Sequence, residues 1–356
     1  MKQLSQIYLL LLLVTGLTGC ATASYYGQAV SGHFGLIMAG EPVDQLIAED
    51  GTSADLKQKL MLSQQARAFA RDVLALPVDD AFTEFVHLDR PWVVVNLVAV
   101  PEFSLRPHRW CYPVLGCQAY RGYFDLDDAR LEQRKFDRRG YDTFIGGVTA
   151  YSTLGWFDDP LHSGFTDLAQ GRMVALMFHE LAHRVLYIEG DTAFNESFAT
   201  AVELEGLKLW STRSGDPDLF ERALQRLRQR NQTLALVQAT ASQLDALYAQ
   251  HGQLPEPALR ERKSELLAQL AQDYVTLSAQ WSQPGPLGTR PEGLNNARIA
   301  LFRQYNQYVP GFRQLLRDQG GQFPAFYQAV ERLSRLPERQ RSARLAELSE
   351  RFEEDL

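Results

Sequence analysis

Apolar residues in the first half of the chain follow helical spacing in some segments and β-branched runs in others. Helical spacing predicts a helix over residues 53–77, and residues 25–49 before it are also predicted as helix. The β-branched run at residues 92–100 predicts the clearest strand, and residues 120–124 and 142–153 predict two more. A charged helix is expected between the last two strands.

The second half of the chain shows helical spacing throughout. A long helix is predicted from Asp167, which would cap it, to Gly190, which would end it, and a second helix follows directly. Two long amphipathic helices then predict a hairpin over residues 216–281, followed by a Pro/Gly-rich break and further helices. The pattern therefore predicts an α+β fold, with a small sheet in the N-terminal half and a mainly helical C-terminal half.

The N-terminal residues have the layout of an export signal. Lys2 precedes an apolar run over residues 7–14, which is too short for a membrane-spanning helix. The small residues before Cys20 resemble the bacterial lipoprotein signal, which implies a lipid on Cys20, a membrane anchor through it and an outer-membrane location facing the periplasm. Simple secretion and an uncleaved anchor are the alternatives.

Three regions follow from these patterns. We expect a signal peptide over residues 1–19, an α+β region carrying the active chemistry over residues 20–215, and a helical region over residues 216–356 that packs on it. The chain has 356 residues and is 45% hydrophobic, which is ordinary globular composition. Its net charge of −7, without a run of Lys or Arg, argues against a nucleic-acid partner.

Export would place the two remaining cysteines in an oxidising compartment. Cys111 and Cys117 flank a short segment in which Pro113 and Gly116 suit a turn. We therefore predict a disulfide between them, with two buried thiols as the alternative.

The segment HELAH carries the strongest chemical signal. Residues four apart lie on the same face of a helix, so His179 and His183 can aim both imidazoles at one zinc ion. Glu180, about 100° around the helix, can take a proton from water at the metal. A catalytic zinc needs three protein ligands, and Glu196 in NESFA is the natural third. Gly190 and Asp191 interrupt the helical pattern before it, so the second helix can fold back toward the histidines.

Two ordinary core histidines are the alternative. The flanks of HELAH are strongly apolar, and burying two histidines and a glutamate there without partners would be costly. We therefore predict one zinc ion per chain, held by His179, His183 and Glu196.

HELAH followed by NESFA resembles the gluzincin metallopeptidases, whose third ligand is a glutamate on a following helix. The whole-chain pattern resembles the bacterial family named "putative aminopeptidase", which includes predicted lipoproteins. This resemblance rests on YYGQA, GYFD, GGVTAYSTLGWFDDP, the zinc segment and NNA…Y…VP, and so covers most of the mature chain. The chain departs from the alanyl-type aminopeptidases of the gluzincin group, because its link from Arg184 to Asn195 is too short for their intervening helix.

The resemblance also implies groups around the zinc. Gluzincins bind the substrate backbone with an edge strand, for which the strand containing Gly147 is the candidate and a plain interior strand the alternative. They stabilise the oxyanion with Tyr or His, and of Tyr151, Tyr305 and Tyr308 we favour Tyr305 because the family resemblance spans it.

Two further residues are candidates around the ligands. Glu203 lies seven residues after Glu196, on the same helical face, and is a candidate to orient a zinc histidine; surface exposure is the alternative. Asn195, directly before Glu196, is a candidate neighbour of the metal or the substrate.

The sequence thus predicts a lipid-anchored zinc metallopeptidase of the cell envelope that acts on peptides. Aminopeptidase is preferred on resemblance alone, and a zinc endopeptidase is the first alternative. A non-catalytic binding or scaffold lipoprotein that keeps the zinc fold is the second, with the helical hairpin as its partner surface. Glu180 argues against the scaffold, because a purely structural metal does not need that residue.

Overall fold

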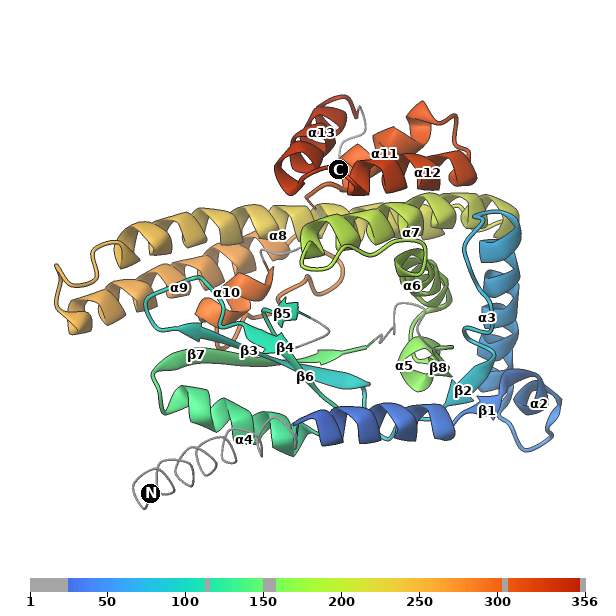
Figure 1. Cartoon of the computed structure of the whole chain (residues 1–356), viewed down its shortest axis with the longest axis horizontal. Coiled ribbons are helices and arrows are strands. Elements are labelled where there is room, and N and C mark those ends of the chain that lie inside the picture. The colour runs from blue at the N-terminus through green and yellow to red at the C-terminus, as the bar shows by residue number, and fades with distance from the viewer. Residues whose placement is uncertain (1–24, 113–115, 150–157, 303–306, 353–356) are drawn as a thin grey trace, which may run out of the picture.

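The computed structural model describes residues 25–112, 116–149, 158–302 and 307–352. The predictions for Cys20, Tyr151 and Tyr305 lie outside these residues. The fold is α+β as predicted. Figure 1 shows two long helices, α7 (Thr192–Ser214) and α8 (Asp218–Tyr248), running across the molecule above its main sheet.

The main sheet has its best-predicted strand at the centre. β3 (Val94–Pro101) pairs antiparallel with β6 (Arg121–Tyr123) on one side and β7 (Tyr141–Val148) on the other. Alternate residues of β3 pack against α4 (Leu126–Asp137), and those between them pack against α10 (Asn296–Phe302). Both faces of β3 are therefore buried, which explains why its sequence is almost continuously apolar.

Two smaller β elements complete the N-terminal half. β1 (Glu41–Pro42), β2 (Glu84–Val86) and β8 (Leu161–His162) form a three-stranded sheet. β4 (Trp110–Tyr112) and β5 (Gly116–Gln118) form an antiparallel pair, and a disulfide joins Cys111 to Cys117 across it.

The predicted helix over residues 25–49 is wrong in its middle. Residues 25–38 are helical, but the chain then extends through β1 before α2 (Val43–Ala48) begins. Pro42 explains the break, because the residue before a proline is pushed out of the helical region. Before the helix that carries HELAH, the chain also forms β8 and the short α5 (Ser163–Thr166), which the sequence pattern does not predict.

The helix that carries HELAH is shorter than predicted. α6 (Gln170–His183) begins after Ala169, and Asp167 ends α5 instead of capping α6. Gly190 does not end α6 either; it lies with a left-handed φ of 79° directly before α7. Residues 184–191, all of which are described, contain no helix, in agreement with the predicted short link.

The second half follows the predicted pattern. α8 and α9 (Glu256–Ser278) form the long hairpin, and α10 lies between that hairpin and the sheet. α11 (Val309–Asp318), α12 (Phe323–Ser334) and α13 (Glu338–Glu350) lie above α7 in Figure 1. Their apolar residues belong to the same core cluster as those of α6 and α7, and the division at residues 215 and 216 stays a prediction.

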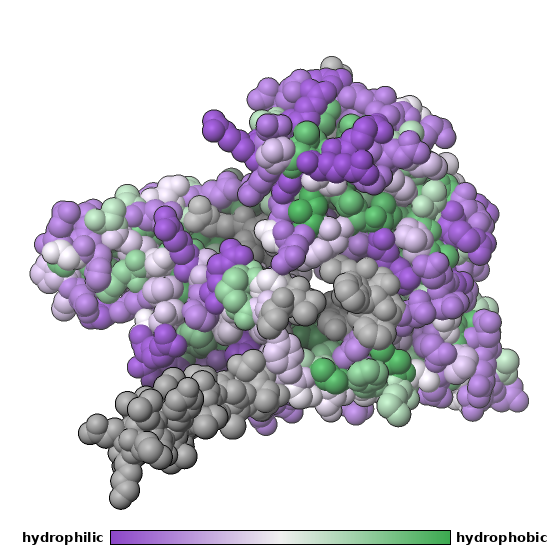
Figure 2. Space-filling view, viewed as in Figure 1, coloured by the Kyte–Doolittle hydropathy of each residue, from purple (hydrophilic) through white to green (hydrophobic). Residues whose placement is uncertain are grey.

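The surface in this view is mostly hydrophilic and is hollowed near its centre, between α7 and the sheet (Figure 2). Within the part of the chain that the structure describes, no helix has the length and apolar character needed to cross a membrane.

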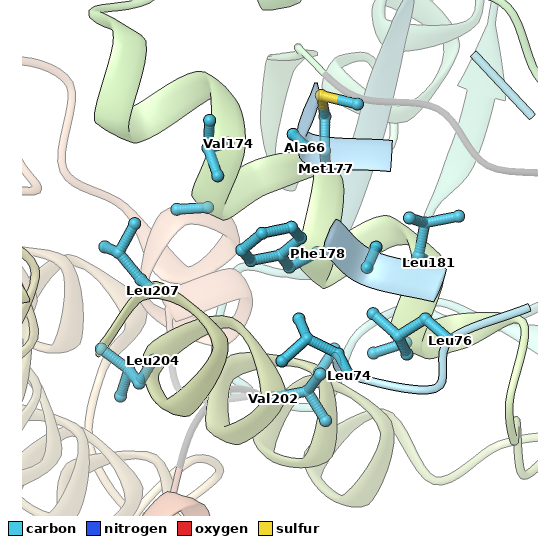
Figure 3. Close-up of a cluster of buried hydrophobic side chains, with 14 of the residues drawn as sticks. Ala66, Leu74, Leu76, Val174, Met177, Phe178, Leu181, Val202, Leu204 and Leu207 are labelled. Carbon is cyan, nitrogen blue, oxygen red and sulfur yellow. The ribbon is translucent and has the colours of Figure 1, made fainter. Parts of the chain in front are cut away.

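The core that positions HELAH is the contact between α6 and α7. Figure 3 shows the side chains that meet there: Val174, Met177, Phe178 and Leu181 of α6, Val202, Leu204 and Leu207 of α7, and Leu74 and Leu76 from the segment after α3 (Ala54–Asp72). Gly206 lets α7 approach closely, since a Cβ there would lie only 2.7 Å from Leu74 Cδ1 and 3.0 Å from Phe178 Cδ2. Filling that space would force the core apart.

A buried ion pair ties the last helix to the start of α7. Asp191 caps α7 by accepting a hydrogen bond from the Phe194 N–H at 3.1 Å, and Arg341 of α13 contacts the same carboxylate at 2.6 Å. The side chains of Asp191 and Arg341 are only 13% and 9% exposed. The C-terminal helices therefore help to fix the segment that leads into Glu196.

Replacing Arg341 with methionine should lower the free energy of unfolding by about 3–5 kcal/mol, because the substitution leaves the carboxylate of Asp191 buried without its cation. Urea unfolding followed by circular dichroism measures the change. Arg351→Met is the matched control: its pair with Asp318 is largely exposed, at 49% and 28%, and should contribute no more than about 1 kcal/mol. Equal losses in the two variants would show that the Arg341 pair has no special role.

Candidate metal centre

The structure brings together the three residues predicted to hold a metal. His179 and His183 project from the same face of α6, and Glu196 reaches them from the first turns of α7. One Glu196 oxygen lies 3.4 Å from His179 Nε2, and the other lies 3.8 Å from His183 Nε2. The opposite face of α6 is locked in the core, so the two histidines are held in place by the packing behind them.

Glu203 lies where its predicted orienting role requires. Its carboxylate accepts a hydrogen bond from His179 Nδ1 at 3.1 Å, about two turns along α7 from Glu196. A proton on Nδ1 leaves the lone pair of Nε2 pointing at Glu196 and His183. Second carboxylates of this kind fix the tautomer of metal-binding histidines and raise their basicity.

The electrostatics of the cluster reflect burial and close charges. Burial raises the pKa of Glu180 to about 7, and burial followed by the charge of His179 lowers the pKa of His183 to about 4. Burial alone would lower the pKa of His179, but hydrogen bonds to Glu196 and Glu203 outweigh it and raise that pKa well above its ordinary value. Burial would raise the pKa of Glu196, but the two histidines lower it overall.

The three side chains fit a metal ion. Each offers one ligand atom, and these atoms lie within 4.8 Å of one another. His179 Nε2 and His183 Nε2 are only 3.3 Å apart, and a Glu196 oxygen lies 3.4 Å from His179 Nε2. Two ring nitrogens and a carboxylate oxygen that converge in this way form a typical donor set for a transition-metal ion.

Asn195, predicted as a neighbour of the metal or the substrate, is bonded instead within the link between α6 and α7. Its side chain is 1% exposed, and its amide both accepts a hydrogen bond from the Ile188 N–H and donates one to the Ile188 carbonyl. These bonds engage both ends of the Asn195 amide with the backbone of Ile188. Its role is to fasten the short link between α6 and α7.

A cleft of about 800 Å³ opens beside the cluster. β7 forms one wall, and its position at the end of the sheet order makes it an edge strand among the described strands. Gly147 lines this wall, as predicted for the strand that would bind substrate; a Cβ there would lie 3.3 Å from Trp92 Cβ. Residues 284–286 and the end of α10 also line the cleft, and most of the remaining lining comes from three helices: Arg172, Leu176 and His179 of α6, Glu196, Thr200 and Glu203 of α7, and Arg226, Gln229 and Arg230 of α8.

Two tyrosines that the sequence reasoning passed over lie near the cluster. Tyr187 is four residues beyond His183, with ring centroids 6.4 Å apart. Burial, Tyr187 and Glu196 together raise the pKa of Tyr120 to about 12. The spacing HRVLY was a usable signal for Tyr187, whereas nothing local pointed to Tyr120. Tyr308, the third tyrosine considered, stands at the start of α11, where its N–H binds Ser197 Oγ.

Comparison with known proteins identifies the family. The model of the family described as "Putative aminopeptidase" matches residues 24–345, and the chain belongs to that family. Neither a search of curated proteins nor a search of solved structures gives a match.

The purified protein should carry about one divalent transition-metal ion per chain, measured by elemental mass spectrometry. Glu196→Gln should lose the ion, because it removes a charged ligand. Glu203→Gln keeps all three ligands and should weaken metal affinity by about 10- to 100-fold in a chelator competition.

Glu189→Gln provides the control, since Glu189 is exposed and precedes α7. Metal content unchanged in Glu196→Gln would rule out this cluster as the binding site.

Proposed function

We propose that this member of the "Putative aminopeptidase" family is a zinc-dependent aminopeptidase. One observation carries the proposal: two histidines of α6 and a glutamate of α7 converge, with Glu180 next to His179 in the sequence, and two of the three ligands, His179 and Glu196, line a cleft with an edge strand along one wall. The family supports peptidase activity, and the choice of a free N-terminus rests on the family alone.

Zinc is the ion that this donor set suits best. Two imidazoles and one carboxylate are the protein ligands of several catalytic zinc sites, and they leave a fourth position open. When bound, zinc would supply a Lewis acid that acidifies water and polarises a carbonyl group. The site differs from that of the alanyl-type aminopeptidases, which the motif resembles, because its link between α6 and α7 is too short for their intervening helix.

The residues around the ligands have separate roles in the proposal. Glu180, partly buried and within electrostatic reach of His179 and Glu196, takes a proton from the attacking water and returns it to the leaving amine. Glu203 positions His179. The backbone of β7 around Gly147 pairs with the extended substrate, as an edge strand can.

A tyrosine completes the site by donating a hydrogen bond to the oxyanion. Tyr305 remains our first choice on family resemblance. Tyr187 is the second, because of its electrostatic coupling to Glu196.

We also propose that the protein is anchored to the outer membrane by a lipid on Cys20 and faces the periplasm. The support is the N-terminal sequence, in which a single Lys, an apolar run and small residues precede that cysteine.

Glu180→Gln should keep the metal and lower kcat on peptide substrates by about 10²- to 10⁴-fold, because it removes the proton acceptor and leaves all three metal ligands in place. Release of amino acids from a peptide library, with metal content measured in parallel, gives both readouts. In the same assay, a loss of rate with metal retained in Tyr305→Phe but not in Tyr187→Phe identifies Tyr305 as the donor; the reverse identifies Tyr187.

Substrates with acetylated N-termini complete this experiment. An aminopeptidase should cleave them about 10- to 100-fold more slowly than the free peptides, because acetylation removes the charged amine and leaves the groups that bind it without a partner. Equal rates would identify an endopeptidase. A metal-loaded wild type that cleaves no member of the library would refute the peptidase proposal and favour a binding lipoprotein.

The lipid anchor makes its own prediction. Cells fed labelled palmitate should incorporate the label into the wild-type protein and into a Cys111→Ser/Cys117→Ser variant, but not into Cys20→Ala. Label retained by Cys20→Ala would exclude this cysteine as the site of lipidation.

A further inference from the structure

One wall of the cleft is positively charged in a chain whose net charge is −7. Arg226 and Arg230 lie four residues apart on α8, so they project from the same face of that helix, and Arg172 faces them from α6. No carboxylate other than Glu196 and Glu203 lines this cleft among the described residues, and both belong to the metal cluster. Arg226 is within electrostatic reach of Glu203, and Arg230 of Glu196, so the basic wall lies near the two carboxylates of the metal cluster.

Arg226 is the central group of this wall. It is partly buried, and it makes no hydrogen bond or ion pair with any described residue. Burial and the charge of Arg172 lower its pKa, with a smaller contribution from Arg222, and the carboxylate of Glu203 opposes them without reversing the shift. Two cations and one carboxylate act on this guanidinium, and no described residue uses its hydrogen-bond donors, so it can still bind an incoming anion.

Gln229 points to the same conclusion independently. Its residue is 7% exposed, yet its side-chain amide has no hydrogen-bond partner among the described residues. It lines both this cleft and a second cavity of about 1010 Å³, and the two cavities share Arg172, Arg226, Gln229 and Pro284. A largely buried amide that lines a cavity and has no described partner is available to bind what enters that cavity.

The distance from the metal cluster fits a peptide. Arg230 acts electrostatically on Glu196, and Arg226 lies one turn further along α8, about 6 Å away along the helix axis. An extended peptide advances about 3.3 Å per residue. The wall therefore meets substrate groups within about three residues of the bond that is cut.

We propose that Arg172, Arg226 and Gln229 form a subsite that binds a carboxylate of the substrate, close to the scissile bond on its C-terminal side. This inference rests on the proposed peptidase function and narrows its substrates to short or acidic peptides. A carboxylate is the anion that unmodified peptides carry, and the planar guanidinium binds it with two parallel hydrogen bonds. Its source is either the C-terminus of a very short peptide or the side chain of Asp or Glu.

Matched substrates test the subsite and separate the two sources. One pair is a tripeptide with a free C-terminus and its C-terminal amide; the other is a longer amidated peptide with Glu or Gln two residues after the scissile bond. The wild type should prefer the carboxylate member of at least one pair by about 10- to 100-fold in kcat/KM, mainly through KM. A preference in the first pair identifies the C-terminus, and one in the second identifies the side chain.

Arg226→Gln should abolish that preference by lowering kcat/KM for the carboxylate member to the value for its uncharged partner. Arg228→Gln is the matched control: it removes the same charge two residues along α8, from an exposed position outside both cavities, and should retain the preference. The proposal fails if the wild type shows no preference in either pair, or if Arg226→Gln behaves like Arg228→Gln.

Calorimetric titration of the same peptides into metal-loaded Glu180→Gln protein decides the matter without turnover. Tighter binding of the carboxylate peptide, lost when Arg226→Gln is added, supports the subsite even if the wild type cleaves nothing and the peptidase proposal falls. Equal binding of the paired peptides, or binding of neither, overturns the subsite whatever the activity.

Discussion

The close approach of α6 and α7 is the constraint on which the rest of the structure depends. Both helices present one face to a shared apolar core, where Gly206 gives Phe178 and Leu74 the space to pack against α7. All the predicted ligands stand on these two helices. The spacing of His179, His183 and Glu196 is therefore set by core packing, and a core that resists small changes in volume holds the ligands within ångströms of one another.

Polar contacts then determine where α7 begins, and so which carboxylate meets the histidines. Asn195 fastens the link through Ile188, while Asp191 caps α7 and accepts Arg341. Because that link has no helix of its own, a slip of one residue at the start of α7 would rotate Glu196 by about 100° away from the site. The C-terminal helices are thus part of the site's support, although they contribute no described ligand.

Local periodicity carried much of the prediction. Helical spacing was enough to put His179 and His183 on one face, and the same spacing linked Glu196 to Glu203. Sequence could not find the ends of α6, because Asp167 and Gly190 are good capping residues that the tertiary structure uses in other elements. It also misread Asn195, whose partner is fixed by the path of the link, and it missed Arg226, which reaches the cleft only because α8 packs against α7. These errors share one cause, since each depends on contacts that no short window contains.

The placement of α8 changes how the helical half should be understood. If the hairpin were only a partner surface, its arginines would be expected in solvent, because arginine side chains are rarely buried without a partner. Here Arg226 and Gln229 face a cavity shared with the metal cluster, and neither has a described partner. The cleft therefore has a ligand-bearing wall with two carboxylates and, within electrostatic reach of them, a basic wall on α8. Such a division suits a substrate that is itself polar along its length, and it makes the hairpin a component of substrate selection.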